Sequence, residues 1–403
     1  MPRAGIIAAV IFLLPSAAAA ADQVEELIKF DAETVSKLSV REAAPGSVTC
    51  AAAREGASPA LALEFKRVPK AGYANVILPV NDKLAKDGAK YDGIVLKVKG
   101  DGSTTYGLVE IRTDGYKNIF QATFPLGSTQ WRDVPVRWDE FFQMNDSEPD
   151  ARMNLAGISN FSFGSRADWG DAKYEVKSIA LAGIPARERR RAAAGTERLA
   201  RSLEKLKEGQ PVTIVALGDS ITFGTKVPAE ERPAKLYFNI VARGLEKSFA
   251  GAKVTTVNAG VGGDTIAEGL VRIGHQVAPS KPDLVMVLLG ANDAMYGFPD
   301  SRVRSTMSEL IDRLIESAPG ADVLILGPAP ISDKAGIPER YDAVFEKLAS
   351  ERNVAYFNLT PPLKALDKAD YKNVFADNVH WAAYGHEVVG RAILGYILGL
   401  SRE

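Results

Sequence analysis

The sequence contains a single cysteine, Cys50, so an intrachain disulfide is impossible and the fold must be stable without covalent cross-links. Histidine is almost as scarce, with three residues, and neither an HExxH run nor paired cysteines occur, so we expect no metal site and no cofactor. An excess of charge is also missing, because 49 Lys+Arg face 50 Asp+Glu. This balance predicts no general attraction to nucleic acid or to anionic membranes.

The chain also lacks an apolar run as long as the roughly 20 residues that span a bilayer. Its N-terminus has a shorter one, in which Arg3 precedes the apolar residues 6–14 and an alanine run follows at 17–21. This pattern is typical of a cleavable signal peptide at residues 1–21, and the alternative of a membrane anchor would need a longer segment. We therefore expect a secreted or periplasmic protein with no membrane span after cleavage.

At 403 residues the chain is long enough for two domains, and its two halves differ in periodicity. In residues 93–99, apolar side chains alternate with two lysines, as in a half-buried strand. A turn at 100–103 and a second strand at 106–112 predict a hairpin. Further short strands are expected at 119–124, 134–138, 160–164 and 174–181. Residues 22–185 are therefore predicted to form an all-β sandwich.

Several motifs of this half resemble the carbohydrate-binding jelly-roll (galactose-binding-like) domains. They are Tyr91-Asp92-Gly93-Ile94, the Val-Lys-Gly-Asp-Gly run that follows, and the aromatic residues Trp131, Trp138, Phe141 and Phe142. The aromatic side chains have two interpretations: they fill the core of the sandwich, or they stack against sugar rings. The resemblance implies an all-β jelly roll.

A charged, alanine-rich segment at residues 186–210 is expected to link the two halves. Arg187, Arg189, Arg190 and Arg191 form a basic cluster that we interpret as a solvated surface. The helical spacing of Leu199, Leu203 and Leu206 predicts an amphipathic helix that leads into the next domain.

Residues 211–403 alternate between continuous apolar runs and helical patterns. The runs at 212–217, 254–257, 284–289, 323–326 and 354–357 are typical of parallel strands buried on both faces. Between the first two, Leu236, Ile240, Val241 and Leu245 form a helical stripe. The alternation predicts a three-layer, doubly wound α/β domain that binds its ligand at the carboxyl ends of the strands.

Polar motifs with catalytic potential occur where these strands end. Ser220 follows the first strand in Gly218-Asp219-Ser220, a turn that exposes a hydroxyl, although a serine there can also simply cap a helix. After the second strand, Gly263 is the candidate N–H donor to a substrate oxygen, with Gly262 as the fallback, and both can equally be turn formers. Asn292 follows the third strand and can present its amide to an oxyanion or cap a helix.

A serine nucleophile needs a base, and the three histidines restrict the choice. His275 and His386 are expected inside helices, as surface or packing residues. His380 is expected in a loop, three residues after Asp377. At that spacing the carboxylate can bind one ring nitrogen while the other faces the serine.

With these motifs in order, the C-terminal half resembles the SGNH (GDSL-type) hydrolase family. The resemblance implies a flavodoxin-like fold, with Ser220 as nucleophile and Asp377 and His380 as its partners. It also implies that Ser220, Gly263 and Asn292 form the oxyanion hole, and that catalysis is a two-step acyl transfer.

Three functions fit these patterns. The favoured hypothesis is an exported esterase that removes acetyl or similar groups from an acylated polysaccharide or oligosaccharide. The second is a lipolytic or thioester hydrolase of the cell envelope, similar to a lysophospholipase or arylesterase. The third is a glycan-binding protein with a vestigial hydrolase fold. The glycan, the acyl group and the oligomeric state stay open.

Overall fold

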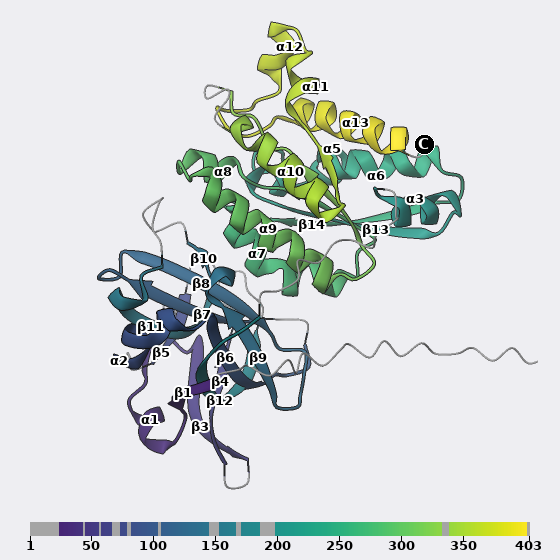
Figure 1. Ribbon diagram of the computed structural model, residues 1–403. Coiled ribbons are helices and arrows are strands. Elements are labelled where there is room, and N and C mark those ends of the chain that lie inside the picture. The colour runs from purple at the N-terminus through teal and green to yellow at the C-terminus, as the bar shows by residue number, and fades with distance from the viewer. Residues whose placement is uncertain are drawn as a thin grey trace, which may run out of the picture.

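The computed structural model describes residues 24–42, 45–55, 58–66, 73–78, 82–103, 106–144, 153–166, 171–185, 198–332 and 338–400. These residues form a β-sandwich followed by an α/β part (Figure 1). The expected signal peptide and the arginine cluster at 187–191 lie outside the described residues, and the domain boundaries stay predictions.

Antiparallel strands form the two sheets of the sandwich. The first sheet has the order β3-β4-β12-β6-β9, with β1 also paired to β12. Its strands are β1 (Val24–Lys29), β3 (Val48–Glu55), β4 (Ser58–Phe65), β6 (Gly93–Lys99), β9 (Arg132–Arg137) and β12 (Ala172–Ala182). The second sheet has the order β10-β8-β7-β11-β5-β2. Its strands are β2 (Ser39–Glu42), β5 (Tyr73–Leu78), β7 (Tyr106–Thr113), β8 (Asn118–Pro125), β10 (Phe142–Gln143) and β11 (Ile158–Arg166).

One apolar core joins these sheets, because Leu96 and Val176 of the first pack with Val109 and Phe161 of the second. This confirms a β-rich N-terminal half, while the jelly-roll topology stays a prediction. The hairpin expected between residues 93–99 and 106–112 is wrong. Strand β6 pairs with β9 and β12, whereas β7 pairs with β8 and β11, so the chain crosses from one sheet to the other at the turn.

The aromatic residues of the sandwich serve mainly as core. Phe141 and Phe142 are buried, and Trp138 packs against the core while its indole N–H donates to the carbonyls of Gly88 and Tyr91. The core interpretation is confirmed for Phe141, whereas Phe142 is buried in a different apolar cluster, which it shares with Leu108, Ile119 and the α/β part. Trp131 lies beneath the Lys177 ammonium, 5.2 Å from the centre of its ring.

Parallel strands form the sheet of the α/β part, in the order β14-β13-β15-β16-β17. They are β13 (Pro211–Gly218), β14 (Lys253–Gly260), β15 (Leu284–Leu288), β16 (Asp322–Leu326) and β17 (Ala355–Phe357). The first strand in the chain lies between the second and third, which is the flavodoxin-like order and confirms the doubly wound sheet. The expectation that every strand is buried on both faces is wrong for β14, because this edge strand is largely exposed before Ala259.

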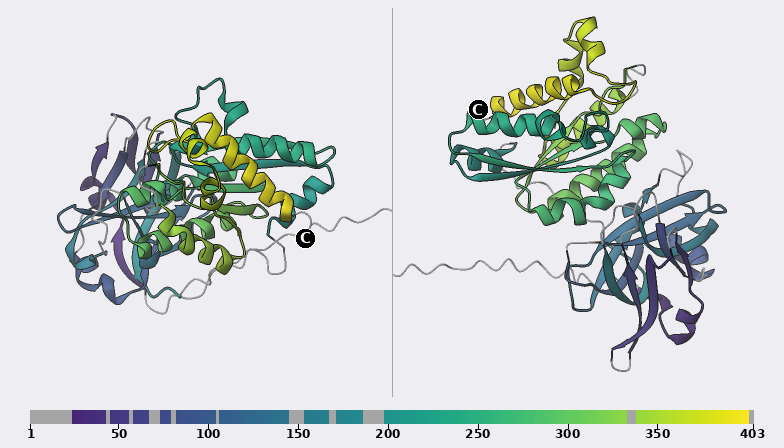
Figure 2. Two further views of the ribbon diagram at one scale, coloured as in Figure 1. Left: turned by 90° about the horizontal axis from the view of Figure 1, so that it is seen from above. Right: turned by 180° about the vertical axis from the view of Figure 1, so that it is seen from behind.

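Helices cover both faces of this sheet (Figures 1 and 2). One layer contains α7, α9 and α10, and the opposite layer contains α3, α6 and α13. The α-helices of the chain are α1 (Ala32–Ser36), α2 (Asp82–Asp87), α3 (Ala200–Lys207), α4 (Ser220–Phe223), α5 (Arg232–Lys235), α6 (Tyr237–Ser248), α7 (Ile266–Arg272), α8 (Ala291–Met295), α9 (Asp300–Ser317), α10 (Asp342–Arg352), α11 (Thr360–Lys364), α12 (Lys368–Asn373) and α13 (Ala383–Leu400). Helix α3 lies where the amphipathic helix was expected, with Leu203 and Leu206 buried.

The sandwich packs against the layer that contains α9 (Figure 1). Leu108, Ile119, Phe142 and Met144 of the second sheet belong to the same apolar cluster as α7 and α9. Polar contacts frame this cluster. The Arg302 guanidinium donates to the Gln143 carbonyl at 2.8 Å, and the Arg313 guanidinium lies 4.9 Å from the centre of the Tyr106 ring. The sandwich therefore covers the outer face of α9 with an apolar contact that polar groups surround.

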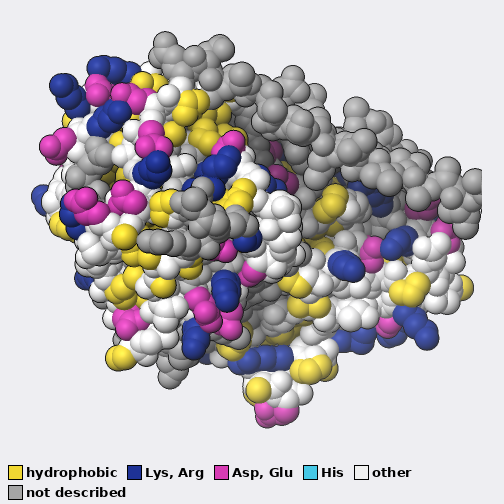
Figure 3. All heavy atoms as spheres, turned by 90° about the horizontal axis from the view of Figure 1, so that it is seen from below, with side chains coloured by type: hydrophobic (Ala, Val, Ile, Leu, Met, Phe, Trp, Pro, Cys, Tyr) yellow, Lys and Arg dark blue, Asp and Glu magenta, His cyan; other side chains and the backbone are white. Residues whose placement is uncertain are grey.

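The surface carries both signs of charge. On the face in Figure 3, basic and acidic side chains are interspersed among neutral ones. This agrees with the near-zero net charge of the sequence. None of the helices in the described ranges combines the length and hydropathy needed to cross a membrane.

Candidate active site

Ser220 is the first residue of α4, directly beyond the carboxyl end of β13. Asp219 caps this helix, since its Oδ1 accepts the Ile221 N–H at 2.9 Å. Burial raises the pKa of Asp219 to about 6. A side chain at Gly218 would overlap Thr222, so only glycine allows the turn to close this tightly. The strand, the cap and the turn together present the Ser220 hydroxyl at the edge of the sheet.

His380 approaches this hydroxyl from the loop between α12 and α13. Its Nε2 lies 3.0 Å from Ser220 Oγ, although 160 residues separate the two in the chain. The loop is held by an isolated bridge between Phe375 and Trp381 and by the Ala376 N–H, which donates to the His380 carbonyl at 2.9 Å. The side chain of His380 is 23% exposed, so its ring is supported by protein yet reachable from solvent.

Asp377 orients the imidazole from the other side. His380 Nδ1 lies 3.0 Å from Oδ2 and 3.1 Å from Oδ1 of the carboxylate. Oδ1 also accepts the backbone N–H groups of Val379, at 2.9 Å, and His380, at 2.7 Å. Partial burial opposes ionisation, but these hydrogen bonds, the imidazole and Lys226 hold the pKa of Asp377 well below its usual range. The carboxylate is therefore ionised at neutral pH.

Sequence reasoning did not identify Lys226. Its ammonium lies 3.2 Å from Asp377 Oδ2, in the segment that follows α4. No local pattern marks this lysine, because only the folded chain brings residues 226 and 377 together.

The residues expected to form an oxyanion hole follow three neighbouring strands: Ser220 follows β13, Gly263 follows β14 and Asn292 follows β15. Among the described residues, neither the Ser220 N–H nor the Gly263 N–H donates to another protein group. Gly263 has a positive φ of 85°, and a Cβ at this position would meet no atom within 4 Å. Gly262 lies closer to the nucleophile, since a Cβ there would be 3.9 Å from the Cβ of Ser220. Gly262 thus lies beside Ser220, and the next residue, Gly263, has open space where a side chain would be.

Asn292 lies in the first turn of α8, after β15. Its Nδ2 donates to the Asp264 carbonyl at 2.7 Å, which ties the amide to the residue after Gly263. An amide nitrogen carries two protons, so the second remains for an acceptor in the site. Asp293 also holds the loop that follows β14, since its Oδ2 accepts the Ile266 N–H at 3.1 Å.

A buried arginine joins the ends of β13 and β14 to this loop, and sequence reasoning missed it. Arg272 Nε donates to the Asp264 carboxylate at 2.7 Å. Its two terminal nitrogens donate to the carbonyls of Ala259, at 2.9 Å, and Gly218, at 3.1 Å. The signal in the sequence is weak, because Arg272 is one of two charged residues of α7, the other being Glu268. Arg272 therefore connects the loops of Ser220 and Gly263.

Two groups noted in the sequence lie outside this constellation. His275 falls in a π-helical turn, Ile273–Val277, and the described structure does not include its side chain. Cys50 lies in β3, and partial burial raises the pKa of its thiol.

His386 is buried within α13, as a packing residue. Its ring is parallel to Tyr237 at 6.1 Å and meets the edge of Trp381. Burial lowers the pKa of His386 to about 3, against about 6.5 in an unfolded chain. Between these values the unfolded state binds a proton that the native state does not. The free energy of unfolding therefore falls as the pH drops from about 6.5 towards 3, by up to about 1.4 kcal/mol per pH unit.

We expect His386→Leu and His386→Phe to remove this contribution. Urea unfolding between pH 4 and pH 7 should then show a wild-type stability that falls more steeply with decreasing pH than that of either variant. The raised pKa values of Asp219, Asp264 and Asp293 act in the opposite direction, but they are common to all three proteins and cancel in the comparison. Parallel pH dependences would contradict a neutral, buried His386.

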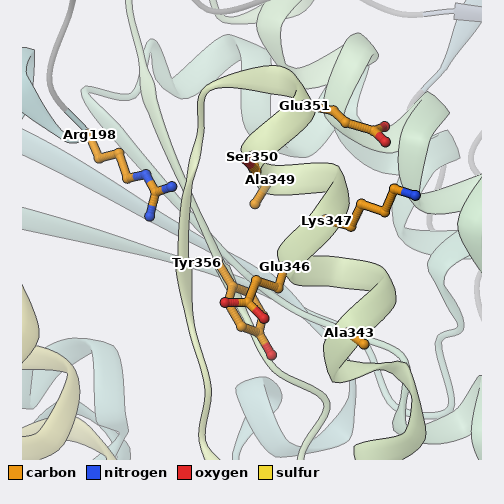
Figure 4. A pocket seen from close by; sticks show the side chains of 8 residues that line it. All are labelled: Arg198, Ala343, Glu346, Lys347, Ala349, Ser350, Glu351 and Tyr356. Atoms are coloured by element: carbon orange, nitrogen blue, oxygen red, sulfur yellow. The ribbon is translucent and has the colours of Figure 1, made fainter.

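A shallow pocket lies away from this constellation, between α10 and the neighbouring strand β17 (Figure 4). It is lined by Arg198, Ala343, Glu346, Lys347, Ala349, Ser350, Glu351 and Tyr356. None of these belongs to the predicted catalytic set, and the pocket mixes both signs of charge.

Comparison with known proteins agrees with the geometry. Residues 216–388 match the model of the GDSL-like lipase/acylhydrolase family. An arylesterase from Vibrio mimicus is 30% identical over 142 residues, which cover 35% of this chain and 67% of that protein. The C-terminal half belongs to this family. Membership places the chain among the esterases and acylhydrolases.

Two further esterases and a second family model also show similarity to this chain. An acetylxylan esterase from Geobacillus stearothermophilus is 25% identical over 208 residues, which cover 47% of this chain and 95% of that protein. A two-domain esterase active on acetylated mannans aligns with a TM-score of 0.44 and 22% identity, over 52% of this chain and 55% of its own length. Residues 50–177 match the model of complex I intermediate-associated protein 30 (CIA30), which is compatible with the β-rich half without defining its topology.

Proposed function

We propose that the protein is an exported serine esterase that removes acetyl groups from carbohydrate. The observation that carries the catalytic part is the continuous chain of contacts from Asp377 through His380 to Ser220. Such a chain is what a serine hydroxyl needs to become a nucleophile at neutral pH.

In the proposed reaction, His380 accepts the Ser220 proton while Oγ attacks the ester carbonyl. Negative charge develops on the carbonyl oxygen, which the N–H groups of Ser220 and Gly263 and the Asn292 amide stabilise. His380 then donates its proton to the leaving alcohol. Water then gives a proton to His380 while its oxygen attacks the acyl carbonyl. The bond between the acyl carbon and Ser220 Oγ breaks, His380 returns the proton to Oγ, and the carboxylic acid leaves. Asp377 holds the imidazole in the required tautomer and stabilises its charged form.

The carbohydrate substrate is supported by the sequence relationship to the acetylxylan esterase, which spans nearly that whole protein. The pattern of residues 1–21 supports export, which fractionation of cells that produce the full chain will test. Purified protein is expected to release acetate from acetylated xylan or a comparable glycan, and Ser220→Ala to abolish the release. Activity confined to long-chain lipid esters would overturn the substrate class.

A lipolytic or aryl-ester substrate is the second candidate, favoured by the similarity to the arylesterase. A series of chromogenic esters from acetate to dodecanoate separates the two. A maximum at acetate supports the deacetylase, and a maximum at long chains supports the lipolytic enzyme.

Asn292→Ala is expected to lower kcat by about 10²- to 10³-fold with little change in KM, because the amide acts mainly on the charge of the transition state. Steady-state kinetics on a short-chain acetate ester will measure both constants. A raised KM with unchanged kcat would instead assign Asn292 to ground-state binding.

A further inference from the structure

Large apolar side chains are exposed at six positions of the described structure: Val24, Val40, Tyr116, Phe223, Met295 and Tyr296. The first three are dispersed over the sandwich. The other three follow directly after catalytic motifs. Exposed apolar groups that gather in one place are a common mark of a ligand-binding surface.

Helix geometry places these three side chains beside the reacting groups. Phe223 is three residues after Ser220 on α4, so the two side chains lie on the same face of the helix, one turn apart. Met295 is the last residue of α8, three residues after Asn292. Tyr296 follows as the residue that caps this helix, and its N–H donates to the Asn292 carbonyl at 2.9 Å. The nucleophile and the oxyanion donor are thus each followed, one turn on, by an exposed apolar group.

The rings of Phe223 and Tyr296 each contact a neighbouring side chain and remain partly exposed to solvent. The Arg232 guanidinium lies 4.5 Å from the centre of the Phe223 ring, and its Nε is anchored at 3.1 Å to the carbonyls of Gly224 and Val227. Phe223 nevertheless remains 42% exposed.

The Tyr296 ring has a similar support. It stacks on the ring of Phe298, with 5.6 Å between the ring centres. The Arg302 guanidinium carbon in turn lies 3.3 Å from the centre of the Phe298 ring. Tyr296 is 53% exposed. Rings fixed in this way bind a ligand without first losing rotational freedom.

We propose that Phe223 and Tyr296 are two sugar-stacking platforms that flank Ser220 and hold an acetylated oligosaccharide across the active site. This inference rests on the proposed function and specifies its substrate as a chain of sugar rings. A pyranose has an apolar face and a rim of hydroxyls, which match an open aromatic face beside polar groups such as the Arg232 guanidinium. An acyl chain would gain its binding energy only through burial, which rings about half exposed do not provide.

The test compares Phe223→Ala, Tyr296→Ala and the double variant on two substrates. Acetylated xylo- or manno-oligosaccharides reach both platforms, whereas ethyl acetate is too small to touch them. We expect kcat/KM on the oligosaccharide to fall roughly tenfold for each single variant, mainly through KM, and kcat/KM on ethyl acetate to stay unchanged. Tyr116→Ala is the matched control, because Tyr116 is 51% exposed on the sandwich and should alter neither value.

Binding provides a second readout that is independent of turnover. Ser220→Ala protein should bind unacetylated xylohexaose or mannohexaose in calorimetry, and adding Tyr296→Ala should weaken that binding. If the wild type deacetylates the oligosaccharide and the platform variants match it, this inference is wrong while the proposed function stands. If the wild type releases no acetate from any glycan, the proposed function itself fails. Losses confined to long-chain esters would assign the rings to an acyl site and overturn the inference.

Discussion

Ser220→Ala is expected to lower kcat on a short-chain acetate ester by about 10⁶-fold, the size of effect seen when the nucleophile of a serine hydrolase is removed. The physical reason is that Ser220 Oγ is the atom expected to form the acyl-enzyme bond, and His380 Nε2 at 3.0 Å then has no hydroxyl to activate. KM should change little, since the oxyanion donors and the surrounding surface remain. Initial rates at high enzyme concentration will measure the residual activity.

Ser305→Ala is the matched control for this variant. Ser305 is an exposed serine on α9 whose hydroxyl donates to the Arg302 carbonyl, and it takes no part in the catalytic contacts, so its removal should leave kcat intact. Labelling with a fluorophosphonate provides an independent check, because it should modify the wild type at Ser220 and leave Ser220→Ala unlabelled. A Ser220→Ala protein that keeps several per cent of the activity would disprove the nucleophile assignment.

The second large effect is expected for Asp377→Asn, with a loss in kcat of about 10⁴-fold. An asparagine has one oxygen, and the backbone N–H groups of Val379 and His380 would take it, as they take Oδ1 of the aspartate. The amide NH2 would then face the imidazole and force the proton onto its Nε2. In that tautomer His380 cannot accept the proton of Ser220.

A further variant separates the contribution of the Asp377 charge from the contribution of its position. Asp377→Glu keeps the charge and displaces it, so an intermediate loss is expected. Asp370→Asn, at a half-buried position of α12, is the control and should retain full activity. If Asp377→Asn loses less than tenfold, the imidazole is oriented by something other than this carboxylate. Thermal unfolding of each variant will show whether the loop at 376–381 stays folded.

Four of the five strands of the α/β part could be predicted to within one residue at each end, because each is a continuous apolar run. The exception is the edge strand β14, which extends three residues beyond the predicted run and is not buried on both faces. The carboxyl ends of the strands meet at one edge, and this is why motifs far apart in the chain could be combined into one candidate site. The geometry places Ser220, His380 and Asp377 in contact and brings Gly262, the fallback donor, close to Ser220. Their catalytic roles stay predictions until the variants are measured.

Long-range pairing explains what the sequence did not reveal. The turn at 100–103 is a genuine local signal, but it cannot show whether β7 returns beside β6 or crosses to the other sheet. The alternation of apolar and polar residues in β6 is equally compatible with pairing to β9 and β12, which are its actual partners. Likewise, Lys226 and Arg272 act through contacts that only tertiary structure creates, and their charge alone does not identify the partner.

The contact between Ser220 and His380 spans 160 residues and joins the first strand of the parallel sheet to the loop before its last helix. Chain closure over such a separation is slow compared with the formation of local turns and helices. Recovered catalysis should therefore lag behind recovered helical signal after dilution from denaturant. The recovery of catalytic activity therefore measures the last step of folding.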